Sequence, residues 1–129
     1  MTNNVIRLIL LVVCSITFGN TLFNHYNLDD EFVTRNNRLT AVDGNSSIFK
    51  LFTESYSKNG GIHYGYRPVT LATFYLEHNI FGETPKVSHA INLILYGLLI
   101  LLVYLFLLKL FKNTNSYILL FVSLLFAIH

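Results

Sequence analysis

Residues 87–111 read VSHAINLILYGLLILLVYLFLLKLF, an almost unbroken apolar run with one formal charge, at Lys109. About 20 apolar residues are enough for a helix to cross a bilayer. Every backbone N–H and C=O group must be satisfied inside the hydrocarbon, and a single segment achieves this only as a helix. The run therefore predicts a transmembrane helix over residues 87–111, and the rest of the chain is interpreted around it.

The composition of the whole chain agrees with a membrane protein. Of its 129 residues, 53% are apolar and 12% are charged. An average soluble domain has about 45–50% apolar and 25% charged residues. The formal charge of +2 is small and provides no basic patch, so we expect no nucleic acid among the partners.

Two further segments are apolar. Val5–Phe23 is long enough to span, which predicts a first transmembrane helix over residues 1–23. A cleaved signal peptide is the alternative, with Arg7 as its basic start and Thr17 and Gly19 near a cleavage point. Tyr117–Ile128 is shorter than the roughly 17–25 residues of a span. We therefore expect residues 117–129 to begin a third span in a truncated chain.

The charges predict an orientation. Arg7, Lys109 and Lys112 flank the apolar segments, while residues 24–86 carry six basic and seven acidic residues. Because positive residues favour the cytoplasmic side, the N-terminus is expected there and residues 24–86 outside. The membrane would be the plasma or inner membrane of a bacterium, or the endoplasmic reticulum of a eukaryote.

The extracytoplasmic loop, residues 24–86, has patterns of its own. Ser47 is a suitable N-cap for a helix over about 47–56, and Pro68 and Gly82 are suited to the two ends of a second helix over about 68–81. Both are predicted to lie in the membrane interface. The expected fold is an all-α membrane protein, with two to three transmembrane helices and a loop that carries short amphipathic helices.

The acidic triplet Asp29-Asp30-Glu31 follows the first apolar segment closely. It is typical of a solvated loop or of the first turn of a helix, where carboxylates meet the positive end of the dipole. A second interpretation is that one carboxylate is a general base for an attacking hydroxyl. A divalent metal site is the third, because paired carboxylates suit hard cations.

Other polar residues are weaker candidates. Arg67 precedes Pro68 at a helix start, a position that suits either phosphate binding or simple charge neutralisation. His89 and Asn92 share one face at the outer end of the main span, where such residues usually bond to each other or to water. The last residue, His129, is either a polar helix end or an accessory site residue.

Several motifs occur together in a recognisable order. They are Asp29-Asp30, Asn36-Asn37, Asp43-Gly44, Ile48-Phe49 with Thr53, Tyr66-Arg67-Pro68-Val69 with Phe74, Phe81-Gly82, His89 with Asn92, and Phe126-Ala127-Ile128-His129. Over nearly the whole chain this order resembles the start of a GT-C glycosyltransferase. The likeness is greatest to the membrane half of the transmembrane and tetratricopeptide-repeat O-mannosyltransferases and their bacterial relatives.

This resemblance implies a partial GT-C fold and a polyprenyl-phosphate sugar donor. Its acidic motif falls on Asp29 and Asp30, the implied catalytic residues, with Asp29 as the base. Its Tyr-Arg-Pro motif falls on Tyr66 and Arg67, which would bind the donor phosphate. The family often opens its second outer loop with an H-P-x-H sequence, of which only His129 is present. His89, Asn92 and His129 are implied accessory residues.

The predicted function is therefore transfer of a sugar from a polyprenyl phosphate to a hydroxyl of a protein or glycan acceptor. Membrane lipid surrounds the protein, no nucleotide cofactor is expected because no glycine-rich fingerprint is present, and a divalent metal is an option. The fragment alone is expected to be inactive. The alternative is a non-enzymatic membrane protein, such as a scaffold or transporter subunit. The centre of residues 87–111 has almost no polar residue, which counts against transport.

Overall fold

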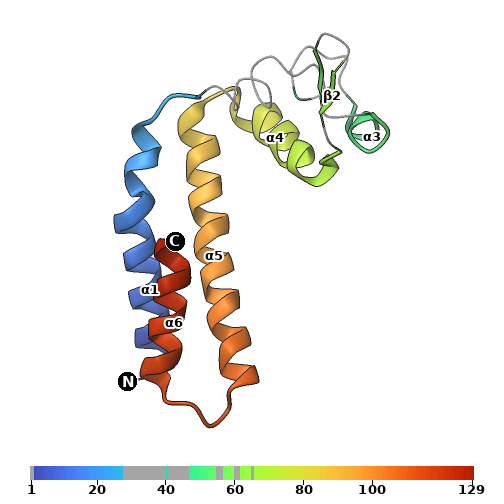
Figure 1. Cartoon of the computed structure of the whole chain (residues 1–129). Helices are drawn as coiled ribbons and strands as arrows, with labels where there is room; N and C mark the ends of the chain where they lie inside the picture. Colours follow the sequence, from blue (N-terminus) through green and yellow to red (C-terminus); the bar gives the residue numbers. More distant parts are fainter. Residues whose placement is uncertain (1, 28–39, 41–46, 55–56, 60–61, 65) are drawn as a thin grey trace. The chain divides into compact units, whose positions relative to one another are not determined.

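The computed structural model describes residues 2–27, 40, 47–54, 57–59, 62–64 and 66–129. The chain divides into two compact units. We call residues 1–23 and 89–129 the helical unit and residues 24–88 the loop unit. Each unit is described by itself. Helix dominates the described residues, as the sequence predicts (Figure 1).

Three long elements build the helical unit. α1 covers Asn3–Phe18 and continues as the 3-10 helix η1, Gly19–Phe23. α5 covers Pro85–Leu110 and α6 covers Ser116–Ile128. Figure 1 shows the N-terminus and the connection between α5 and α6 at the same end of the unit. Arg7, Lys109 and Lys112 therefore belong to the same end of the unit.

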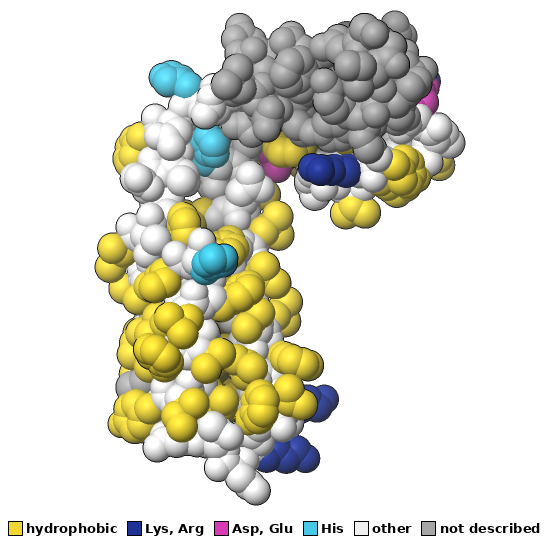
Figure 2. All heavy atoms as spheres, viewed as in Figure 1, with side chains coloured by type: hydrophobic (Ala, Val, Ile, Leu, Met, Phe, Trp, Pro, Cys, Tyr) yellow, Lys and Arg dark blue, Asp and Glu magenta, His cyan; other side chains and the backbone are white. Residues whose placement is uncertain are grey.

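Two of these helices meet the length and composition of a membrane span. They are Asn3–Phe23 and Pro85–Leu110, while α6, with 13 residues, is shorter. Their outer faces are apolar, since Leu8, Leu102 and Phe106 are each more than 60% exposed. Figure 2 shows hydrophobic side chains over most of the visible surface of this unit. Such a surface suits lipid, because in water it would be an exposed apolar patch of unusual size.

The core of the helical unit lies where α1 and α6 meet. Each helix contributes buried residues one turn apart along a single face, and α5 adds two more. The buried residues are Ile6, Leu10 and Cys14 of α1, Leu119, Ser123 and Ala127 of α6, and Ile100 and Tyr104 of α5. Small side chains allow two helices to approach closely, which explains Ser123 and Ala127 at this interface.

Polar side chains add connections between the three helices. The hydroxyl of Tyr104 donates to Asn3 Oδ1 at 3.2 Å, which joins α5 to the start of α1. The buried hydroxyl of Ser123 donates to the carbonyl oxygen of Leu119 at 2.8 Å, so its burial leaves no hydrogen-bond donor unsatisfied. Asn115 caps α6, because its Oδ1 accepts from the N–H of Tyr117 at 3.0 Å.

The described residues of the loop unit include two helices and one small strand ladder. α3 covers Ile48–Leu51, and α4 covers Pro68–Phe81, the range that the sequence predicts. The strands β1, Ser57–Asn59, and β2, Ile62–Tyr64, pair antiparallel. This ladder is the only β structure among the described residues, and the all-α prediction did not include it.

α3 is shorter than the helix predicted over about 47–56. Its last turn is closed by Thr53, whose hydroxyl donates to the carbonyl oxygens of Phe49 and Lys50, each at 3.4 Å. A Thr side chain that bonds to nearby backbone competes with helix continuation, and a single turn is stable only through tertiary packing. Here that packing is between Leu51 and Leu71 of α4, both fully buried.

Candidate functional site

A pocket opens in the helical unit near the ends of η1 and α6. Its volume is about 390 Å³, and it is lined by Phe18, Thr21, His89, Asn92, Leu93, Tyr96 and His129. Small-molecule sites commonly measure about 300–1,000 Å³ and combine apolar walls with a few polar groups. This pocket has that character.

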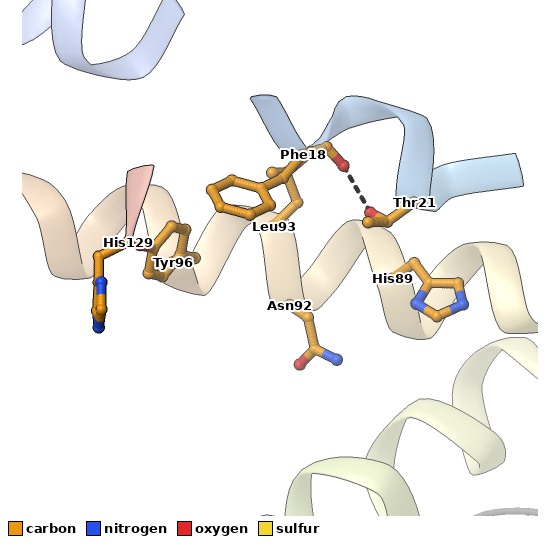
Figure 3. Close-up of a pocket in the computed structure, with 7 residues that line it drawn as sticks. All are labelled: Phe18, Thr21, His89, Asn92, Leu93, Tyr96 and His129. Atoms are coloured by element: carbon orange, nitrogen blue, oxygen red, sulfur yellow. Dashed lines mark hydrogen bonds between the residues drawn. The ribbon is translucent and has the colours of Figure 1, made fainter. Parts of the chain in front are cut away.

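α5 supplies the polar side of the pocket. His89, Asn92 and Tyr96 fall at i, i+3 and i+7, so they lie along one face of the helix. Figure 3 shows the side chains of Asn92 and His129 pointing to the same side of α5. His89 is half-buried, whereas Asn92 and His129 are exposed. The pocket therefore joins two imidazoles and one amide, which come from the start of α5 and from the residue after α6.

Two other polar groups of the pocket already have partners. The hydroxyl of Tyr96 donates to the carbonyl oxygens of Phe126 and Ala127, each at 3.2 Å. These carbonyls lie in the last turn of α6, where no intrahelical donor remains for them. The hydroxyl of Thr21 donates to the carbonyl oxygen of Phe18 at 2.7 Å. Their protons are used within the fold, whereas the side chains of Asn92 and His129 are exposed and accessible to a ligand.

The apolar wall of the pocket is held by an aromatic contact. The rings of Phe18 and Tyr96 meet edge to face, with centroids 5.3 Å apart. Such pairs contribute about 0.5–1.5 kcal/mol beyond the area they bury. Leu93 completes this wall. The contact also fixes the ring of Tyr96, which positions its hydroxyl toward the end of α6.

Three residues predicted from the sequence, His89, Asn92 and His129, lie together in the pocket. Tyr96 was not among the predicted residues, although its spacing from His89 and Asn92 was a usable signal. Phe18, Thr21 and Leu93 carried no such signal, because one aromatic, one hydroxyl and one Leu are ordinary in an apolar helix.

The remaining predicted site residues belong to the loop unit. Tyr66 and Arg67 precede α4, and the hydroxyl of Tyr66 donates to the carbonyl oxygen of Phe52 at 2.7 Å. Arg67 is exposed, and its carbonyl oxygen accepts from the N–H of Leu71 at 3.1 Å, which begins α4. Asp29 and Asp30 lie outside the described residues.

Metal ligation was left open by the sequence. Within the part of the chain that the structure describes, no three His, Cys, Asp or Glu side chains lie close enough to hold an ion. The carboxylates that would suit a divalent cation are Asp29 and Asp30, so the prediction of a metal depends on them.

Comparison with known proteins found no family model, no curated protein and no solved structure that matches this chain. The relationship to GT-C enzymes is therefore an inference from sequence motifs alone.

Proposed function

We propose that this chain is the N-terminal part of a polytopic GT-C glycosyltransferase, which moves a sugar from a polyprenyl phosphate to an acceptor hydroxyl on the extracytoplasmic face. The pocket is the observation that supports this most. His89, Asn92 and His129 gather in a unit whose outer surface is largely apolar. Polar and ionisable groups among membrane helices are costly, and they commonly mark a substrate path.

The pocket suits the two chemical parts of such a donor. Imidazole and amide N–H groups can donate to phosphate oxygens, and His89, Asn92 and His129 supply these groups. Phe18 and Leu93 offer an apolar wall to the first isoprene units. A pocket of about 390 Å³ holds a headgroup and a short length of chain, while the rest of the lipid stays in the bilayer.

The proposed reaction breaks the bond between the anomeric carbon and the phosphate oxygen and forms a bond from that carbon to the acceptor oxygen. Asp29 would accept the proton that the acceptor hydroxyl loses, with Asp30 as its neighbour. Arg67 would stabilise the charge on the departing phosphate, which a guanidinium matches in shape. Arg67 directly precedes α4, and a helix start favours anions. Tyr66 would support the position of Arg67 through its bond to Phe52.

The test is transfer from a defined donor. Membranes that contain the complete protein are incubated with polyprenyl-phosphate mannose or glucose, labelled in the sugar, and label in protein or glycan is measured. Wild type should transfer label, and Asp29→Asn should abolish transfer while the amount of membrane-inserted protein is unchanged. Glu83→Gln, which removes an exposed carboxylate between α4 and α5, is the matched control and should transfer normally. Normal transfer by Asp29→Asn would remove it as the base, and no transfer by wild type from either donor would contradict this donor class.

A second candidate is a non-enzymatic subunit of a membrane assembly. The exposed apolar faces of α1, α5 and α6 favour it as well, because partner helices could cover them in place of lipid. The reading frame beyond His129 separates the two. A Pro-x-His continuation and further apolar runs support the transferase, whereas a stop codon supports the subunit.

A further inference from the structure

α4 in the loop unit exposes several large apolar side chains and buries two polar ones. Val69 is 71% exposed, Leu76 49% and Ile80 68%, whereas Glu77 is only 5% exposed and His78 2%. A helix on the surface of a soluble domain has the opposite distribution, because apolar groups leave water and charged groups stay in it. The exposed side of α4 therefore suits an apolar environment better than water.

Three of the four large apolar residues that α4 exposes, all except Phe81, lie along one face. Val69, Thr73, Leu76 and Ile80 follow one another at intervals of three or four residues, so they share a face of the helix, which we call the α4 stripe. The stripe is about 16 Å long at the rise of an α-helix. Its single polar member, Thr73, donates its hydroxyl to the carbonyl oxygen of Thr70 at 2.8 Å, so the stripe needs no water to satisfy it.

The opposite side of α4 packs inside the loop unit. Leu71 contacts Leu51 of α3, and Nδ1 of His78 lies 3.1 Å from the carbonyl oxygen of Thr40. A carbonyl oxygen only accepts, so Nδ1 carries the proton in this bond. These contacts fix the rotation of α4 about its axis. The stripe is therefore the side of the helix that the loop unit leaves uncovered.

The chain itself identifies the nearest apolar medium. Only Gly82–Thr84 separate the last residue of α4 from the first residue of α5, one of the two helices able to cross a membrane. Three residues and their flanking bonds reach at most about 14 Å. If α5 spans, the end of the stripe at Ile80 cannot be far from the bilayer surface.

Other exposed side chains of the loop unit are of the types common at a membrane interface. Phe49 is 78% exposed and Tyr66 61% exposed, and Lys50 and Arg67 adjoin them in sequence. Aromatic and basic residues are enriched at the level of lipid headgroups. Figure 2 shows hydrophobic and Lys or Arg side chains together on the exposed side of the loop unit.

We propose that the α4 stripe inserts into the headgroup and upper acyl region of the leaflet from which the loop unit emerges. The occupant of this surface is lipid. The stripe enters about 5–10 Å, the depth typical of interfacial helices. The inference depends on a membrane-spanning α5 and is independent of sugar transfer.

Spin-label depth measurement tests the insertion in the full chain, reconstituted in phosphatidylcholine and phosphatidylglycerol vesicles. The single cysteine, Cys14, is first replaced by Ser. Nitroxides at Val69→Cys and Ile80→Cys probe both ends of the stripe, and Thr70→Cys and Asn79→Cys are exposed controls on other faces of α4. Leu102→Cys, 62% exposed on α5, is the reference for a lipid-facing span.

The expected result is that both stripe labels collide more often with oxygen and less often with a water-soluble nickel complex than the two controls do. Their calculated depth should be about 5–10 Å below the phosphates. Stripe labels as accessible to nickel as the controls would overturn the proposal. Shielding from both reagents would also overturn it, since it indicates a protein partner or a second copy. A Leu102 label outside the lipid would instead contradict the membrane placement of α5.

Discussion

The hydroxyl of Tyr96 on α5 lies 3.2 Å from the carbonyl oxygen of Ala127, at the end of α6. This bond satisfies a carbonyl that the helix itself leaves without a donor. It also connects the helix that carries His89 and Asn92 to the one that ends beside His129. Tyr96 thus adds a direct bond between the two halves of the pocket, beside the packing of α6 on α1.

Removing that hydroxyl should destabilise the helical unit while keeping its aromatic packing. Tyr96→Phe loses the bonds to Phe126 and Ala127 but retains the ring against Phe18. A neutral hydrogen bond contributes about 0.5–1.5 kcal/mol, so the free energy of unfolding should fall by about 1 kcal/mol. Unfolding of the detergent-solubilised protein measures this. Tyr117→Phe, at an exposed position of α6, should change nothing, and equal effects would show that the bonds are not stabilising.

Because α1 and α6 pack closely, a larger side chain at position 123 should destabilise the helical unit. Ser123→Leu adds volume at a fully buried position, and overpacking usually costs about 1–3 kcal/mol. The same substitution at Val122, which is 42% exposed, should be nearly neutral. Thermal unfolding in detergent compares the two variants. A tolerated Ser123→Leu would mean that α6 does not pack through this face.

The long helices show how far the sequence predicts the fold. Pro68 and Gly82 correctly predict both ends of α4, and Gly82 has a φ of 72°, which suits glycine. α5 begins at Pro85, before the apolar run, because the N–H groups of Val87 and Ser88 bond to the carbonyl oxygen of Thr84. Counting apolar residues cannot detect this polar first turn.

The pocket was predictable only in part. His89 and Asn92 can be grouped from their spacing on one helix. His129 joins them only because α6 packs along α1 through Ser123 and Ala127, a tertiary contact that no local pattern encodes. Its position therefore required the structure.

The pocket should determine donor affinity if it binds the polyprenyl phosphate. His89→Ala and Asn92→Ala, made in the complete protein, should each raise the KM for the donor by roughly fivefold to tenfold, since one hydrogen bond contributes about 1–1.5 kcal/mol. Initial rates over a range of donor concentrations measure this. Ile94→Ala, on an exposed face of α5, is the control. An unchanged KM in both pocket variants would place the donor elsewhere.

Arg67 should act through its shape as well as its charge. Arg67→Ala should reduce kcat/KM for the donor by at least about tenfold, and Arg67→Lys should restore only part of it, because an ammonium lacks the planar fork of donors. Lys86→Ala removes another exposed cation of the loop unit. Equal losses in Arg67→Ala and Lys86→Ala would reduce the role of Arg67 to general charge.

The central prediction is that the loop unit lies on the extracytoplasmic side of the membrane. In a Cys14→Ser background, single cysteines at positions 29 and 112 are exposed to a membrane-impermeant maleimide in intact cells and after permeabilisation. We predict that Asp29→Cys reacts in intact cells and that Lys112→Cys reacts only after permeabilisation. Reaction of position 112 in intact cells, with position 29 protected until permeabilisation, would contradict it.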